Sequence, residues 1–210
     1  MDSIKNLEWR YAVKKFDSEK VLPKDKIDRL KQAFNLTATS YGLQPITMAV
    51  IHNKELQNKL VEHSYGQQQV AQASHVLVIC IQNDINEEYI NRYFEQIKKI
   101  RGTSQDILDP FKNALLADFS KKEVPEIEQW SKNQAYLALG NLLTVCALEK
   151  IDSCPMEGFV PSAYDAVLNL KKRGLTSVLV LPVGYRADDD MFSEFKKVRK
   201  NIEDSVIEIN

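Results

Sequence analysis

Short apolar runs alternate with longer amphipathic segments along this chain, and the runs predict strands. The residues from His75 to Gln82 are apolar almost without interruption and mostly β-branched, which is typical of a strand buried on both faces. Ile46 to Ile51 and Thr176 to Val183 predict two further buried strands, and Ser205 to Ile209 predicts a weak one. These runs together predict a central sheet.

Between the runs, apolar residues recur at intervals of three and four, which predicts helices. One helix follows Leu22, with Pro23 at its first position. In Glu87–Arg101 the apolar stripe favours core packing, and it consists of Tyr89, Ile90, Tyr93, Phe94 and Ile97. Further helices are expected at Ser3–Trp9, Glu55–His63, Glu126–Lys150 and Val167–Lys172, the last stopped by Gly174, whereas Leu108–Phe119 is less regular.

The expected helix at Glu126–Lys150 is the longest, and its middle is apolar on nearly every side. Such a helix is buried on most sides, either at the centre of the fold or at a subunit interface. Gly140 within it costs about 1 kcal/mol relative to alanine, which indicates close packing at that point. Strands that alternate with helices favour an α/β or α+β sandwich. No linker divides residues 1–210, so we expect a single domain.

Composition narrows the possible partners and the compartment. The net charge of −1 provides no overall field for nucleic acid, so an anionic ligand would need a local basic cluster. The three cysteines have no paired spacing, which fits a reducing compartment, and no cysteine or histidine spacing indicates a metal. The charged N-terminus predicts no signal peptide, and no apolar run is long enough to span a bilayer. We therefore expect a cytoplasmic protein without membrane or nucleic-acid partners.

Two basic groups lie at opposite ends of the chain and are the main candidates for ligand binding. Arg10 and Lys14 are four residues apart, so one helical turn would place them side by side. The second group comprises Lys196, Lys197, Arg199 and Lys200. If the fold brings the two ends together, the basic residues form a phosphate pocket. If it does not, both groups lie on solvated faces, and the charges alone favour this second interpretation. No GxGxxG, Walker, GxSxG or HExxH motif suggests another nucleotide or hydrolase site.

Two loops could also contact a ligand, or they could be ordinary connections. The loop from Thr39 to Pro45 is rich in hydroxyl and amide groups. The segment from Cys154 to Phe159 is punctuated by proline and glycine, so it could present backbone N–H groups. Taken alone, each is better explained as a connector.

Taken in order, these segments resemble the motifs of the nitroreductase family over nearly the whole chain. Arg10–Asp17 is similar to its opening R-x-S-x-K-x-F motif, and Ser40–Pro45 to its S-x-N-x-Q-P loop. Asn133–Asn141 resembles its central helix, and Pro155–Phe159 matches P-x-E-G-F. Val183–Tyr185 and Lys197–Arg199 match the closing V-G-Y and K-x-R. Each motif is weak alone, but six in the right order make a strong signal.

The resemblance implies an α+β sandwich, with a mostly antiparallel sheet flanked by helices, that forms an intertwined homodimer with FMN at the subunit interface. By this likeness Arg10, Lys197 and Arg199 hold the FMN phosphate, and Lys14 lies near the flavin pyrimidine. Thr39 and Ser40 are expected to come from the other subunit. We expect the same of the turn at Glu157 and Gly158, and the resemblance implies that the backbone of this turn donates a hydrogen bond to flavin N5. Gln134 lies close to the ring, and the other expected cofactor contacts are Tyr11, Ala12, Gly42, Gly66, Gln69, Pro155 and Met156.

Several positions depart from the family pattern. Ala12 replaces a serine and Gly42 an asparagine, while Gly66 and Gln69 stand where many relatives have asparagine and lysine. The missing lysine predicts a lower flavin potential. Leu115 and Leu116 are the expected acceptor pocket, where relatives often have two phenylalanines, so we expect a less aromatic pocket.

The implied activity is ping-pong hydride transfer from NAD(P)H through FMN to a nitro compound, a quinone or a pterin. The flavin carries the chemistry, so we assign no catalytic side chain. Two alternatives stay open: a flavin-binding dimer with little turnover, used for storage or sensing, and an enone reductase of the same superfamily.

Overall fold

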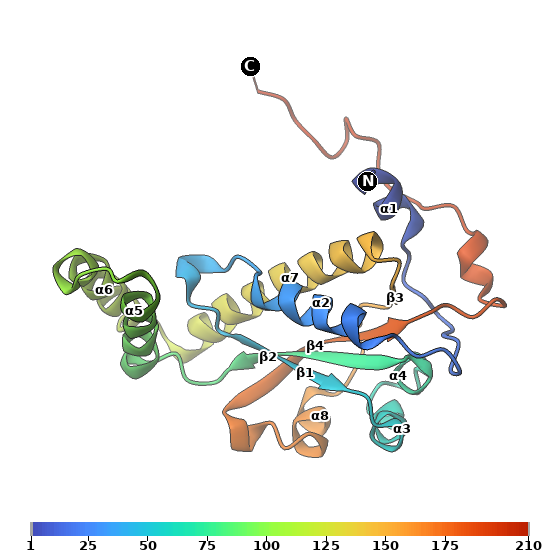
Figure 1. Ribbon diagram of the computed structural model, residues 1–210, viewed down its shortest axis with the longest axis horizontal. Coiled ribbons are helices and arrows are strands. Elements are labelled where there is room, and N and C mark those ends of the chain that lie inside the picture. Colours follow the sequence, from blue (N-terminus) through green and yellow to red (C-terminus); the bar gives the residue numbers. More distant parts are fainter. Residues whose placement is uncertain (1, 210) are drawn as a thin grey trace.

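The computed structural model describes residues 2–209 and has a four-stranded antiparallel sheet between layers of helices (Figure 1). The strand order is β1 (Ile46–Ile51), β2 (His75–Gln82), β4 (Leu175–Gly184) and β3 (Asp152–Ser153). The sequence prediction for β1 and β2 is confirmed residue for residue, and β4 extends the predicted strand by one residue at each end.

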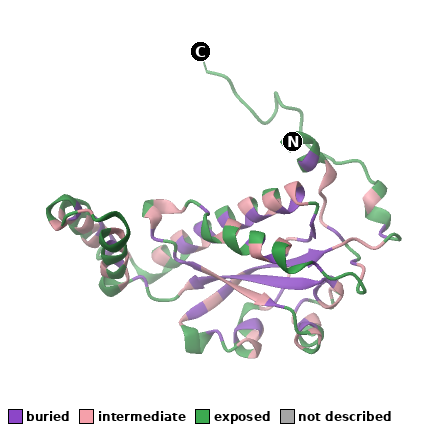
Figure 2. Cartoon of the chain, in the orientation of Figure 1, coloured by how far each residue is buried: buried purple, intermediate pink, exposed green. Residues whose placement is uncertain are grey.

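Strand β2 shows why its sequence is continuously apolar. Leu77, Ile79 and Ile81 face the core under α2 (Lys24–Asn35) and α7 (Val124–Leu148). The alternate residues Val76, Val78 and Cys80 face the core under α3 (Lys54–Glu62), α4 (Gln69–Gln72) and α8 (Pro161–Val167). Figure 2 shows the central strands buried between these two helical layers.

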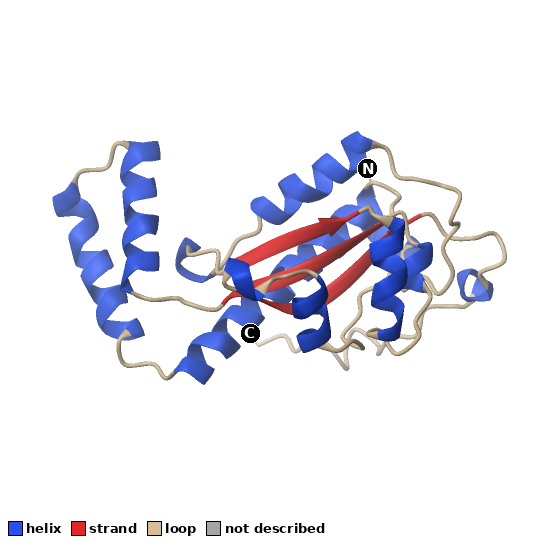
Figure 3. Ribbon diagram, turned by 90° about the horizontal axis from the view of Figure 1, so that it is seen from below, coloured by secondary structure: helices blue, strands red, loops and turns tan. Residues whose placement is uncertain are grey.

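Helices α5 (Glu87–Arg101) and α6 (Gln105–Phe119) form a pair that projects beyond the end of the sheet (Figure 3). The α5 prediction is confirmed at both ends, because the Asn86 side chain caps the first turn and Gly102 ends the helix in the left-handed conformation. The α6 helix is longer and more regular than the sequence suggested, even though it contains Pro110. Burial of its apolar residues against α5 offsets the missing N–H.

Helix α7 is only partly buried in a single chain. Tyr136 and Leu137 are 46% and 55% exposed, and a Cβ added to Gly140 would meet nothing within 4 Å. The expectations of burial on most sides and of close packing at Gly140 are therefore wrong within one chain. An apolar face near the middle of α7 is left open.

Other segment predictions need correction. Pro23 is the N-cap of α2 rather than its first residue, and α3 starts and ends one residue earlier than expected. The helix expected at 167–172 is replaced by α8, which ends at Val167, and by a short 3-10 turn that Gly174 stops as predicted. The strand expected at Ser205–Ile209 does not form, because its backbone has no strand partner among residues 2–209.

The two ends of the chain meet at one end of the molecule. Helix α1 (Ser3–Trp9) lies beside the C-terminal segment and against α7 (Figure 1). Within residues 2–209, no helix combines the length and the apolar character needed to cross a membrane.

Candidate functional site

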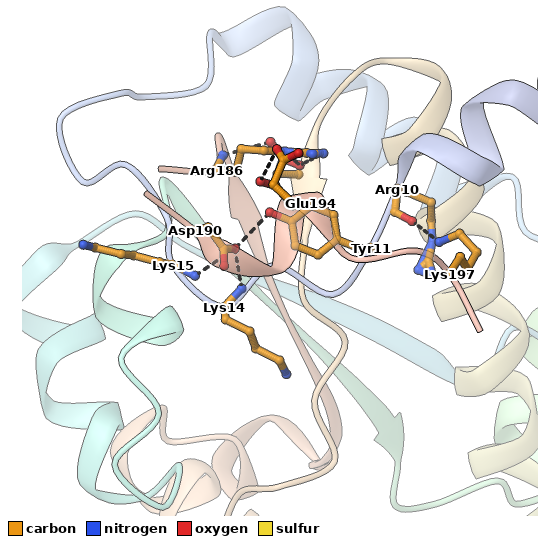
Figure 4. A network of polar contacts seen from close by, with 10 residues as sticks. Arg10, Tyr11, Lys14, Lys15, Arg186, Asp190, Glu194 and Lys197 are labelled. Carbon is orange, nitrogen blue, oxygen red and sulfur yellow. Dashed lines mark hydrogen bonds and ion pairs between the residues drawn. The ribbon is translucent and has the colours of Figure 1, made fainter. Parts of the chain in front are cut away.

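Side chains from both ends of the chain line a pocket of about 380 Å³. Its cations are Arg10 and Lys14 from the N-terminal segment and Lys196, Lys197 and Arg199 from the C-terminal one, with Trp9, Tyr11, Ala12, Phe192 and Phe195 beside them. The Lys197 ammonium donates a hydrogen bond to the Arg10 carbonyl (Figure 4). The fold thus joins the two basic groups that the sequence left apart.

Positive charge in this pocket is not compensated. Burial and the neighbouring Arg199 lower the pKa of Arg10, and burial, Arg10 and Arg199 lower that of Lys197. Among the ion pairs of residues 2–209, none includes Arg10, Lys14, Lys197 or Arg199, and Glu8 is the one carboxylate on the pocket wall. A group of cations that repel one another and have no carboxylate partner can bind a multiply charged anion, such as a phosphate monoester.

Asp190 holds the basic N-terminal segment in place. Its carboxylate is 3% exposed and accepts hydrogen bonds from the Tyr11 hydroxyl at 2.9 Å and from the Lys14 N–H at 3.0 Å (Figure 4). Burial alone would raise the pKa of Asp190, but these donors together hold it below its usual value. Burial and the Asp190 bond raise the pKa of Tyr11. Asp190 gives no signal in the sequence, because three consecutive aspartates resemble a solvated turn.

Arg186 supports the same segment from the other side. Its guanidinium stacks on the rings of Trp9 and Tyr11, 4.5 Å from each centroid, and pairs with the buried Asp152. Residues 10–14 are consequently extended rather than helical, so the expected helical turn between Arg10 and Lys14 is wrong. Both cations reach the pocket because this extended segment is fixed along the wall.

The turn at Pro155–Gly158 lies close to the basic segment of the same chain. The Val13 N–H donates to the Ser153 carbonyl at 3.2 Å, and Ala12 forms a bridge with Ser153. Lys14 is close enough to oppose the effect of burial, which raises the pKa of the Cys154 thiol. Ser153 and Cys154, which lead into the turn, thus lie beside Lys14 of their own chain, and this favours a turn from the same chain as Lys14 over the different chain that we expected from the sequence.

Residues 66–69 lie beside that turn. Gly66 has a φ of +75°, which favours glycine, and Gln69 is buried at the start of α4. The Gln67 amide donates to the Gly158 carbonyl at 2.8 Å. The backbone at 66–69 and the turn at 155–158 thus form one continuous edge of the candidate site.

The loop at Thr39–Gly42 is elsewhere in the chain. Its Ser40 N–H donates to the buried Gln134 side chain at 2.9 Å. At the other end of α7, Cys146 lies near Arg10 of the basic pocket. Gln134 is twelve residues before Cys146 in this helix, a separation of roughly 18 Å along the helix axis. Within one chain, then, the structure brings Ser40 to Gln134 but not to the basic pocket.

Gly42 explains one departure from the family pattern. Its φ is +74°, and a Cβ there would lie 2.5 Å from the Tyr93 hydroxyl. A larger residue would displace the Tyr93 hydroxyl, and the positive φ also favours glycine at this position.

The expected acceptor-pocket residues lie on α6 and not beside the basic pocket of their own chain. Leu115 is buried in the α5–α6 core, which leaves the half-buried Leu116 as the more accessible of the two. The surface near the Ser40 loop is more aromatic than expected, because Tyr41 packs within 6.5 Å of Phe111, Phe119 and Trp130. The sequence gives no signal for this aromatic cluster, because its members are far apart along the chain.

The chain is similar in sequence to proteins of one known family. Residues 7–185 match the model of the nitroreductase family. A Staphylococcus aureus protein predicted to be an NAD(P)H nitroreductase is 31% identical over 191 residues, covering 86% of this chain and 85% of the relative. The oxygen-insensitive NAD(P)H nitroreductase of Salmonella typhimurium is 26% identical over an alignment of 217 residues that covers both proteins completely.

A solved structure from Exiguobacterium sibiricum, determined in complex with FMN, has the same fold. It superposes with a TM-score of 0.84 at 17% identity, covering 100% of this chain and 98% of the other. The expected α+β fold is thereby confirmed.

Proposed function

This chain belongs to the nitroreductase family, and from that premise we propose that it is an NAD(P)H-dependent FMN oxidoreductase that reduces small acceptors such as nitro compounds, quinones or pterins. The observation that carries the proposal is the uncompensated basic pocket at the junction of the two chain ends. The phosphate of FMN is the kind of anion that such a pocket fits. The relatives named for NAD(P)H nitroreductase activity and the FMN-bound neighbour support the same reading.

In this proposal the residues of the chain bind and orient, while bound FMN supplies the hydride chemistry. Arg10, Lys197 and Arg199 hold the phosphate through charge-assisted hydrogen bonds. Lys14 lines the same pocket, and its charge would favour a flavin ring that becomes more negative on reduction. Asp190 keeps the Lys14 backbone fixed, so little reorganisation accompanies ligand binding. In the proposal, NAD(P)H and the electron acceptor would bind at the same place one after the other, which would give ping-pong kinetics.

The proposed active form is a cytoplasmic homodimer in which the second copy completes each site. The Ser40 loop and Gln134 are about 18 Å from the basic pocket along α7, too far to complete that pocket from the same chain. The open apolar face of α7 at Tyr136, Leu137 and Gly140 supports an interface there. The Ser40 loop of one copy would then face the basic pocket of the other.

A reduction experiment tests this proposal. The purified protein, reconstituted with FMN, should be yellow, should bleach with NADH or NADPH under anaerobic conditions, and should recover its colour when a quinone or nitro compound is added. Steady-state rates should give parallel double-reciprocal lines. A protein that fails to bind FMN would contradict the proposal, and one that binds FMN without bleaching would be a flavin-binding protein instead.

A further inference from the structure

The turn at Glu157–Gly158 is fixed at more points than a connection requires. Met156 exchanges two backbone hydrogen bonds with Val180, at 2.8 and 3.1 Å, and the Val160 N–H donates to the His63 carbonyl at 2.8 Å. The turn between these anchors therefore has little freedom to move as a whole.

Two side chains fix the inside of the turn from opposite faces of the sheet. From the α4 side, the Gln67 amide donates to the Gly158 carbonyl at 2.8 Å. From α7, the Tyr136 hydroxyl donates to the Glu157 carboxylate at 2.7 Å, and this bond and partial burial raise the pKa of Tyr136. Glycine has the greatest backbone freedom of any residue, so the hydrogen bond from Gln67 to the Gly158 carbonyl restricts a backbone that would otherwise be flexible.

The constrained turn contains free backbone hydrogen-bond donors. The Phe159 N–H is used within the turn, donating to the Glu157 carbonyl at 2.9 Å. The N–H groups of Glu157 and Gly158 donate to no acceptor within residues 2–209. Two successive free N–H groups in an ordered turn form a site for a hydrogen-bond acceptor or an anion.

We propose that Gln67 and Tyr136 are positioning residues for the Glu157–Gly158 turn, and that through it they set the reduction potential of the bound flavin. The inference rests on the proposed function, since it takes the turn to face the flavin ring. Gln67 fixes the peptide that follows Gly158, so that the free N–H groups stay aimed at the ring. Tyr136 holds the Glu157 carboxylate against α7, so that this negative charge stays away from the ring.

The two residues should shift the potential in opposite directions. Oxidised flavin accepts a hydrogen bond at N5, whereas reduced flavin carries a proton there. Loss of the correctly oriented N–H groups should therefore weaken the binding of oxidised FMN more than the binding of reduced FMN. Gln67→Met keeps the side-chain length and removes the donor, and it should raise the potential. Tyr136→Phe removes only the hydroxyl; it frees the carboxylate to approach the ring and should lower the potential.

The test measures the affinity for FMN and the flavin midpoint potential of each variant. Gln67→Met should bind oxidised FMN about tenfold more weakly, and a tenfold difference between the two redox states corresponds to a rise of about 30 mV. Gln32→Met is the matched control, because this glutamine is exposed on α2, away from the site, and its side chain makes no hydrogen bond within residues 2–209. If Gln67→Met fails to fold, Gln67→Leu removes the same donor without adding a charge.

A rescue experiment separates positioning from general packing. In Tyr136→Phe combined with Glu157→Gln, no carboxylate is left to approach the ring, so the potential should return toward that of the wild type. FMN affinities and potentials equal to those of the wild type in Gln67→Met and Tyr136→Phe would overturn the inference. That outcome differs from failure of the proposed function, in which the wild-type chain itself would not bind or reduce FMN.

Discussion

Replacing Arg199 by glutamine should separate ligand binding from fold stability. Its cation helps to lower the pKa of both Arg10 and Lys197, and it forms no ion pair with a carboxylate among residues 2–209. In the free protein, Arg199→Gln therefore removes like-charge repulsion and should leave thermal stability unchanged or slightly higher. With FMN present, it removes a charge-assisted contact to the phosphate.

The size of the effect follows from that contact. A hydrogen bond to a charged group contributes about 1.5–3 kcal/mol, which corresponds to roughly 10- to 150-fold weaker binding. At an FMN concentration of about 100 times the wild-type Kd, the wild type should be stabilised by about 2.7 kcal/mol, and between about half and about nine-tenths of this should be lost in the variant.

A fluorescence titration of the FMN-free protein measures the binding, and a thermal melt measures stability. Riboflavin, which lacks the phosphate, should bind wild type and Arg199→Gln equally. Arg101→Gln, at the exposed end of α5, is the control for loss of an arginine. Equal FMN affinity in wild type and Arg199→Gln, or an equal loss for FMN and riboflavin, would refute the assignment of Arg199 to the phosphate.

Three other outcomes are expected. Lys14→Met should retain FMN but lower its midpoint potential and slow its reduction by NAD(P)H; an unchanged potential in a spectroelectrochemical titration would exclude a position near the ring. Asp190→Asn should cost about 1.5–3 kcal/mol of unfolding free energy at pH 7, and because the folded-state pKa of Asp190 lies below the usual 3.8, the deficit should shrink as the pH falls below about 4. If urea unfolding showed the same loss of unfolding free energy for Asp190→Asn at pH 3 as at pH 7, this role of the Asp190 carboxylate would be contradicted. A heterodimer of an Arg10→Glu/Arg199→Glu subunit with a Ser40→Trp subunit should contain one intact site and bind one FMN, although neither homodimer binds any; a verified heterodimer without FMN would mean that the site is not shared between chains.

The sequence by itself determined those elements whose signals are local. β2 is buried on both faces, so its positions from Val76 to Ile81 are all apolar, and the polar His75 and Gln82 mark its two ends. Helix α5 carries its own boundaries, an asparagine cap and a left-handed glycine. The basic residues, the Ser40 loop and the Pro155–Phe159 motif were also found in this way, because residue type and order are local properties.

Only the tertiary structure decided how these pieces meet. The Tyr11–Asp190 hydrogen bond joins residues 179 positions apart, and no periodicity records such a contact. The open face of α7 could not be distinguished from a buried one, because apolar character is the same whether a helix packs within its chain or against a partner. The extended conformation of residues 10–14 likewise results from Arg186 and Asp190, whose anchoring contacts overrode the local helical spacing of Arg10 and Lys14.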